Sequence, residues 1–398
     1  MNLAEQISKY RPNLGESEKQ ITCYAPFTAV HINRHGAVRP CPFSFIKEKD
    51  LAENVQSKYR WNKCDAIPKW RPDKSLRDIW NGKTFEKLRE ECIDGNLKNS
   101  ECMYCINSIL EKKPPSSLDF DWVGGKRGIN NDVPRELELE LSSVCNLMCL
   151  ACGPVHSTQH IKRLGLENNP HYRSVFEDND DYRLGFVEDL RSMIHEIYRV
   201  NFTGGEPFAQ RIVYDILNMI EEENPSNLKI HFTTNGNIMN GSVKKLAEKK
   251  STRFTISLDS IDPKVYPILR VKGSFKNVMN NIKFLLKQKA ELGCSFVVSK
   301  HNVRDLPNIV SWCNERFIEF SYHIISNMGG SWEQITPISP EFETDEYKHE
   351  LKDYLKSKIY DIKTIEIKNP AASHEEWRKW DVQNKNIKMF KQYIERIK

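Results

Sequence analysis

Three cysteines near the middle of the chain have a spacing that suits metal binding. Cys145, Cys149 and Cys152 follow closely on an alternating apolar run at 137–141 and are separated from one another by three and two residues. Three thiolates on one short loop can hold three irons of a [4Fe-4S] cube and leave the fourth iron open for a ligand. A zinc site is the alternative, because zinc also favours clustered cysteines and could take His156 as its fourth ligand.

Four further cysteines lie near the N-terminus. Cys23 and Cys41 flank a predicted hairpin, and Cys102 and Cys105, separated by two residues, follow a predicted helix. Four thiolates could meet at one metal, either an iron-sulfur cluster or a zinc ion that only fixes a small domain. The other cysteines are predicted to be free or buried thiols rather than ligands: Cys64, Cys92, Cys294 and Cys313.

Composition argues for an intracellular metal-binding protein. The eleven cysteines are odd in number and few relative to the 398 residues, and the first twenty residues contain no apolar run. No stretch approaches the roughly 20 apolar residues of a membrane span, so we expect a soluble, cytoplasmic protein without membrane contact. The net charge of +5 is spread over 59 basic and 54 acidic side chains and leaves nucleic-acid binding undecided.

The elements expected to position the N-terminal cysteines are a hairpin and a helix. Short runs at 28–33 and 37–40 flank a turn at His35-Gly36, which favours a hairpin. The segment 75–95 opens with Ser75 and an acidic residue in capping-box spacing, continues with an apolar stripe and stops at a glycine, which predicts one helix.

Six short apolar or alternating runs recur between helix-like segments in the rest of the chain. Such alternation predicts parallel strands with helical crossovers, in an α/β partial barrel or an open doubly wound sheet. In both folds the working site lies at the C-terminal ends of the strands. The predicted strands are 137–141, 198–204, 228–234, 254–260, 294–299 and 320–326.

The segment 113–134 is predicted to be a linker, because it combines prolines, a glycine pair and mixed charge without periodicity. It divides the chain into a small N-terminal α+β domain at 1–112 and a core at 135–330. The remaining segment, 331–398, reads as a solvated helical cap with no chemistry of its own.

Short motifs follow the predicted strands in a fixed order. Gly204-Gly205-Glu206-Pro207 follows the second strand, Thr233 to Gly236 ends the third, and Ser257 to Ser260 ends the fourth, with Arg270 beyond it. Each motif alone is weak. Together with the cysteine run after the first strand, they resemble the radical S-adenosylmethionine (radical SAM) family over roughly residues 135–330.

The resemblance implies a (β/α)6 partial barrel that binds SAM. It implies that the GGEP residues bind the amino end of the methionine moiety, that Ser257 and Arg270 bind its carboxylate, and that Asp259 lies near the ribose. The chain departs from many family members at Ala151, where they have an aromatic residue that touches adenine. The residues implied to bind SAM are Gly204, Gly205, Glu206, Pro207, Asn235, Ser257, Asp259 and Arg270.

The resemblance also implies the chemistry. A reduced cluster donates one electron to the sulfonium of SAM, and the resulting 5'-deoxyadenosyl radical removes a hydrogen atom from the substrate. An electron donor such as flavodoxin or ferredoxin is then required.

The N-terminal cysteines resemble those of a twitch domain, the single-cluster relative of the SPASM domain. Gly36 lies five positions before Cys41, as in that pattern. The resemblance implies one auxiliary [4Fe-4S] cluster whose task is electron transfer. Twitch and SPASM domains usually follow the barrel, whereas here the domain precedes it.

Several substrate classes remain open. A peptide or protein side chain is slightly favoured, beside a small polar molecule such as a sugar, aminoglycoside or nucleotide. A nucleoside or nucleic-acid base is the alternative, because tryptophans among cations at 69–74 and 376–381 could stack on bases. A contrasting hypothesis is a binding protein with two zinc sites and no catalysis.

Overall fold

The computed structural model describes residues 3–42, 68–95, 102–111, 115–121, 132–324, 344–362 and 373–397. The chain forms two compact units. The first comprises residues 1–144 and 164–231, and the second comprises 145–163 and 232–398. Cys64, most of the predicted linker and the start of the predicted cap lie outside the described residues.

A mixed sheet forms the centre of the first unit. Strands β1 (Ala29–Asn33) and β2 (Val38–Arg39) form the predicted antiparallel hairpin. Strand β1 also pairs in parallel with β3 (Glu136–Glu140), which pairs in parallel with β4 (Arg199–Phe202). The hairpin between Cys23 and Cys41 therefore extends the same sheet as the first strand of the predicted core.

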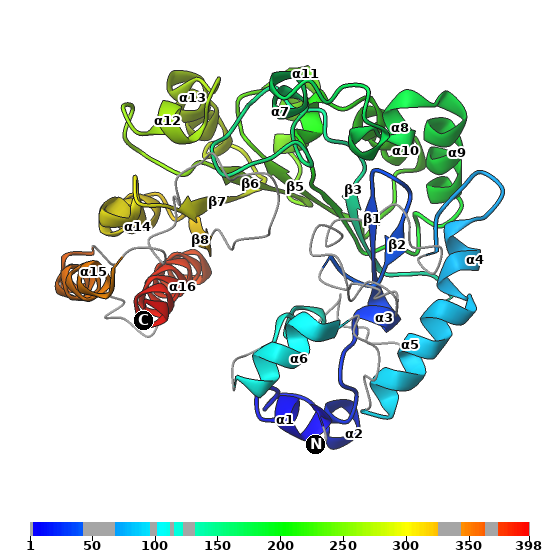
Figure 1. Cartoon of the computed structure of the whole chain (residues 1–398), viewed down its shortest axis with the longest axis horizontal. Helices are drawn as coiled ribbons and strands as arrows, with labels where there is room; N and C mark the ends of the chain where they lie inside the picture. The colour runs from blue at the N-terminus through cyan, green and yellow to red at the C-terminus, as the bar shows by residue number, and fades with distance from the viewer. Residues whose placement is uncertain are drawn as a thin grey trace. The chain divides into compact units, whose positions relative to one another are not determined.

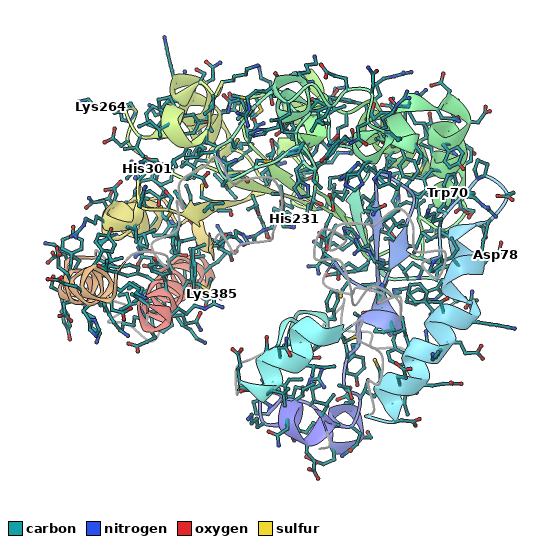
Figure 2. The ribbon with its side chains drawn as sticks, in the orientation of Figure 1. Trp70, Asp78, His231, Lys264, His301 and Lys385 are labelled. Carbon is teal, nitrogen blue, oxygen red and sulfur yellow. The ribbon has the colours of Figure 1, made fainter. Side chains whose placement is uncertain are left out.

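Helices α8 (Val175–Asp178), α9 (Asp180–Arg191) and α10 (Arg211–Glu223) pack together in the first unit (Figure 1). Trp70 joins them to the hairpin turn. Its buried ring lies beside Phe186, at 5.0 Å between centroids, and its Nε1 donates to Asp189 at 2.7 Å (Figure 2).

The predicted helix at 75–95 is two helices. Ser75 caps the first by accepting from the amide of Asp78, as its spacing predicts, but that helix ends at Asn81 and Gly82 caps a second one. The break was not visible in the apolar stripe, which continues through both. The helical segments of this region are α1 (Leu3–Ser8), α2 (Glu16–Lys19), α3 (Ala25–Thr28), α4 (Leu76–Trp80), α5 (Lys83–Ile93), α6 (Met103–Leu110) and the 3-10 helix η3 (Ser116–Phe120).

The second unit is also built from parallel strands and helices. Strands β6 (Thr252–Ser257), β7 (Glu291–Val298) and β8 (Glu319–Ile324) pair in parallel in that order, and the unit boundary falls inside β5 (Lys229–Thr234). All six predicted core strands are present. The main helices of the unit are α7 (Thr158–Arg163), α11 (Gly241–Ala247), α12 (Tyr266–Leu269), α13 (Phe275–Leu285), α14 (Leu306–Glu315), α15 (Asp345–Ser357) and α16 (His374–Arg396).

Helix α16 is packed more firmly than a solvated cap. It lies against β8 and α14, and Lys385, labelled in Figure 2, pairs with Asp381 one turn earlier in the same helix. Asn386, which is fully buried, accepts from the amide of Phe320 at 2.7 Å and donates to Asn314 at 2.9 Å. Among the described residues, no helix is long and apolar enough to cross a membrane.

Candidate functional site

The cysteine loop, residues 145–152, starts between side chains from the first turn of α7. The amide of Cys145 donates to the Thr158 hydroxyl, and the Gln159 side chain donates to the Cys145 carbonyl, both at 3.2 Å. The backbone N–H and C=O of Cys145 are therefore both hydrogen-bonded to side chains of α7. These contacts fix where the first thiol leaves the loop.

The same helix holds the middle of the cysteine loop. The hydroxyl of Ser157 donates to the carbonyl of Leu147 at 2.6 Å, and Nε2 of His160 lies 3.0 Å from the carbonyl of Cys149. Burial lowers the pKa of His160, which favours the neutral ring that donates one hydrogen bond here. The sequence does not predict these positioning residues, because their local signal is no more than the Ser-Thr pair at a helix start.

A second segment pairs with the cysteine loop along its backbone. Met148 donates to the carbonyl of Val271 at 3.0 Å, and Leu150 donates to the carbonyl of Leu269 at 2.8 Å. These bonds flank Arg270, which the sequence places far from the loop. The structure thereby brings Arg270 beside the cysteines.

Arg270 is buried between a carboxylate and a thiol. Its Nε lies 2.7 Å from Oδ2 of Asp259, and its Nη1 lies 3.5 Å from Sγ of Cys149. Burial lowers the pKa of Arg270, but Asp259 and Cys149 outweigh burial, so the net shift is upward. The guanidinium is therefore a permanent positive charge next to one of the three thiols.

Asp259 is locked in place by the strands around it. Its backbone has a left-handed φ of 62°, and its carboxylate accepts from the amide of Val297 at 2.8 Å. Its carbonyl accepts from the side chain of Asn302 at 2.7 Å. A non-glycine residue in this conformation persists only where its surroundings fix it, and such positions gather at functional sites. The carboxylate holds Arg270, while its predicted place near the ribose stays a prediction.

Two more predicted residues lie at strand ends of the second unit. Asn235, one residue after β5, donates from Nδ2 to Oδ1 of Asn146 at 2.8 Å and so contacts the cysteine loop. Ser257 is the last residue of β6, next to the turn that leads to Asp259. Asn235 thus contacts the cysteine loop and Asp259 contacts Arg270, while Ser257 is placed only by its position at the strand end.

The GGEP motif lies in the first unit, against the end of β3. A Cβ on Gly205 would lie 2.2 Å from the Val144 carbonyl, and one on Gly204, where φ is +98°, would lie 2.8 Å from that of Ser142. The amides of Gly205 and Glu206 donate to these same two carbonyls at 2.9 and 2.8 Å. Both glycines are therefore required by a close backbone approach. Glu206 itself is fully buried.

The thiols of the cysteine loop suit a multi-iron cofactor. The pKa of Cys152 rises to about 12, through burial first and then through the charges of Cys149 and Cys145. Thiolates this close repel one another, and bound metal cations would remove that cost and deprotonate the thiols. None of the described cysteines is in a disulfide, and among the described residues no three His, Cys, Asp or Glu side chains already have the arrangement of a metal site.

Three of the predicted N-terminal thiols, those of Cys23, Cys41 and Cys102, also lie near one another. Burial, followed by the charges of Cys92, Cys102 and Cys41, raises the pKa of Cys23 well above its usual range. The amide of Ala25 donates to Sγ of Cys23 at 3.4 Å, a contact typical of cluster-ligating sulfur. Cys102 stands directly before α6 and Cys105 lies in its first turn. Cys92, predicted to be a leftover thiol, belongs to this neighbourhood.

The predicted core cysteines behave as expected. Cys294 in β7 and Cys313 in α14 are both fully buried in the second unit. Burial raises the pKa of both thiols, and the charge of Cys294 adds to the shift of Cys313. They fill the core as small apolar side chains.

Comparison with known families identifies both regions. The radical SAM superfamily matches residues 139–313, and the SPASM iron-sulfur cluster-binding domain matches residues 23–106. The chain contains both domains and is a radical SAM enzyme with its SPASM-class domain at the N-terminal side. The α/β class and the partial barrel are thereby confirmed. The two domains imply a catalytic [4Fe-4S] cluster, SAM and an auxiliary iron-sulfur cluster.

The curated relatives cover only part of the chain. A probable GTP 3',8-cyclase of Methanocaldococcus jannaschii is 25% identical over 250 residues, which are 61% of this chain and 78% of the relative. A GTP 3',8-cyclase of Vibrio parahaemolyticus is 26% identical over 189 residues, 47% of this chain and 52% of the relative. The chain thus spans most of the first relative and about half of the second.

Solved structures resemble the chain more distantly. The alignment with Streptococcus suis SuiB covers 58% of this chain and 48% of the SuiB chain, with 21% identity and a TM-score of 0.41. The alignment with native anSMEcpe with bound AdoMet covers 58% of this chain and 63% of the anSMEcpe chain, with 17% identity and a TM-score of 0.41.

Proposed function

We propose that this chain binds SAM at a [4Fe-4S] cluster held by Cys145, Cys149 and Cys152 and removes a hydrogen atom from a nucleotide or nucleoside. The observation that carries the proposal is the backbone pairing of the cysteine loop with the segment of Arg270. It holds three thiols and one permanent cation together in the second unit. When bound, the cluster supplies one electron that cleaves SAM to methionine and a 5'-deoxyadenosyl radical.

The residues of the chain then have distinct tasks. Arg270 keeps its charge at every accessible pH and can grip the carboxylate of SAM through two N–H groups, while Asp259 fixes its orientation. Asn235 supports the cysteine loop through Asn146. Backbone carbonyls of the GGEP motif and the carboxylate of Glu206 would accept from the ammonium of SAM. The proposed SAM contacts are Gly204, Gly205, Glu206, Pro207, Asn235, Ser257, Asp259 and Arg270.

The N-terminal region, residues 1–112, is proposed to hold the auxiliary cluster through Cys23, Cys41, Cys102 and Cys105. A cluster with four thiolate ligands has no open iron, so its task would be to exchange one electron with the substrate radical. A flavodoxin or ferredoxin would supply electrons to the catalytic cluster. The core at 135–330 and the C-terminal segment at 331–398 complete the proposed domain division.

A nucleotide now ranks ahead of a peptide as the proposed substrate. The sequence alone slightly favoured a peptide, but the curated relatives cited above are named GTP 3',8-cyclases.

The test measures SAM cleavage by anaerobically reconstituted enzyme with dithionite. We expect GTP or a related nucleotide to accelerate 5'-deoxyadenosine formation and to transfer deuterium into it from a labelled ribose or base. Acceleration by peptides and not by any nucleotide would contradict the proposed substrate class while leaving the radical chemistry intact.

A further inference from the structure

Glu140, the last residue of β3, carries a hydrogen-bonded carboxylate beside the GGEP motif. We propose that Glu140 accepts a hydrogen bond from a hydroxyl or N–H of the nucleotide, and that His31 and Arg39 are positioning residues that hold its carboxylate. The proposal rests on the substrate class proposed above and adds which part of the nucleotide this unit recognises.

The two faces of β3 differ in polarity. Leu139 is buried, whereas Glu138 and Glu140 point to the opposite face and are half-buried. Glu136, at the start of the strand, is already held on that face by Nε of Arg199 at 2.8 Å. Glu140 instead lies at the carboxyl end of the strand, which is where ligands bind to parallel sheets.

Two hydrogen bonds in series orient the carboxylate of Glu140. Nη2 of Arg39 lies 3.1 Å from Nδ1 of His31, and Nε2 of His31 lies 3.2 Å from Oε2 of Glu140. A guanidinium can only donate, so Nδ1 of His31 accepts and the hydrogen of the ring is on Nε2. The imidazole therefore donates to the carboxylate and fixes its direction.

This network is buried at one end and open at the other. Arg39 is 4% exposed and the side chain of His31 is 2% exposed, but that of Glu140 is 19% exposed. A carboxylate has about four acceptor positions on its two oxygens, so it can accept from a ligand while it holds His31. Side chains fixed by buried hydrogen bonds provide the precise geometry that a binding site requires.

The position of Glu140 beside the GGEP motif indicates what it would bind. A Cβ on Gly204 would lie 3.2 Å from Cγ of Glu140, so the glutamate side chain fills the space next to that glycine. Hydrogen transfer requires the substrate to lie close to SAM, which the same motif is proposed to bind. A carboxylate repels phosphate and accepts from hydroxyl and N–H groups, so Glu140 would contact the sugar or the base and not the triphosphate.

The experiment measures the affinities of the reconstituted holoenzyme for GTP and for SAM by anaerobic equilibrium dialysis. We expect Glu140→Gln to weaken GTP binding about tenfold to a hundredfold, as for a lost hydrogen bond to a charged group, and to change SAM affinity by less than about twofold. Glu223→Gln is the matched control, because Glu223 pairs with His195 through the same atoms at 3.3 Å on the surface of the same unit, and it should bind GTP as wild type does.

Nucleotide analogues identify the donor group. Wild type and Glu140→Gln should bind equally an analogue that lacks the contacted group, which is 2'-deoxy-GTP for the ribose hydroxyl and ITP for the amino group of the base. Equal GTP affinity in wild type and Glu140→Gln overturns the proposal alone, as does a loss of SAM affinity without a loss of GTP affinity. Failure of wild type to bind GTP or either analogue contradicts the proposed substrate class as well.

Two variants of His31 test its positioning role. A glutamine amide has both a donor and an acceptor, so His31→Gln can replace both hydrogen bonds and should keep most of the GTP affinity. His31→Leu can replace neither and should lose as much GTP affinity as Glu140→Gln, while its SAM affinity checks that the fold is intact. An equal loss of GTP affinity in the two variants would overturn the positioning role.

Discussion

Removal of Arg270 gives the sharpest test of how the cysteine loop is held. The Arg270 and Asp259 side chains are 11% and 2% exposed, so water screens their ion pair little. An exposed pair is worth about 0–1 kcal/mol, whereas breaking a buried pair by removing one partner costs about 3–5 kcal/mol. Arg270→Met should therefore lower the free energy of unfolding by about 3–5 kcal/mol, because the carboxylate of Asp259 loses its guanidinium partner and, among the described residues, keeps the hydrogen bond from the amide of Val297.

Adding Asp259→Asn shows whether the loss of stability in Arg270→Met comes from the unpaired carboxylate. In Arg270→Met with Asp259→Asn, the asparagine oxygen still accepts from Val297 and no buried charge is left without a counter-charge. The double variant should recover about 2 kcal/mol relative to the sum of the single variants. Urea unfolding of the metal-free, reduced protein, followed by circular dichroism, measures all three variants.

A matched arginine controls for the loss of side-chain packing. Arg253 pairs with Glu291 and Glu319 near the surface, with a side chain 29% exposed. Arg253→Met should cost no more than about 1 kcal/mol. If it costs as much as Arg270→Met, or if the two substitutions at 270 and 259 are simply additive, then burial of the ion pair is not what fixes Arg270.

Three other predictions use different measurements. Alanine at all three cysteines of the loop at 145–152 should reduce the iron content from about eight to about four and abolish SAM cleavage. Gly205→Ala should cost about 1–3 kcal/mol and weaken SAM binding, because its Cβ would lie 2.2 Å from the Val144 carbonyl, while Gly241→Ala, with open space at its Cβ, should be neutral or stabilising. Burial lowers the pKa of His35 to about 3, so below about pH 6.5 the unfolded chain binds a proton at His35 that the folded chain does not. The free energy of unfolding should therefore fall by up to about 1.4 kcal/mol for each unit by which the pH drops below 6.5. Comparing the unfolding of wild type and His35→Gln between pH 7 and 5 checks this, and equal pH dependence of the two proteins would refute it.

The sequence predicted what local patterns determine. Short apolar or alternating runs predicted all six core strands and the β1–β2 hairpin, because the burial of a strand is written in its own few residues. Strand β6 alternates between buried and half-buried residues, whereas β1 and the middle of β7 are buried without a break. The break between α4 and α5 was missed, since Asn81 and Gly82 interrupt the backbone while the apolar stripe continues on both sides. A stripe reports which face is buried and not whether the helix is continuous.

The candidate site was predicted less completely, for a physical reason. Spacing alone identified the loop cysteines, but their supports come from backbone contacts between distant segments. The pairing of Leu150 with Leu269, and the position of Cys92 beside Cys23, have no local signature. Long-range contacts of this kind appear only when the chain is folded.

The parallel pairing of β1 with β3 affects how the chain can fold while it is being synthesised. Ala29 pairs with Glu136, so β1 leaves the ribosome about 100 residues before its neighbour in the sheet exists. At about 5–20 residues per second, that delay is about 5–20 seconds. During this interval the hairpin presents an open strand edge on that side, a site at which nascent chains can associate wrongly. Stable insertion of iron at the N-terminal thiols is therefore expected only after residues 136–140 have emerged.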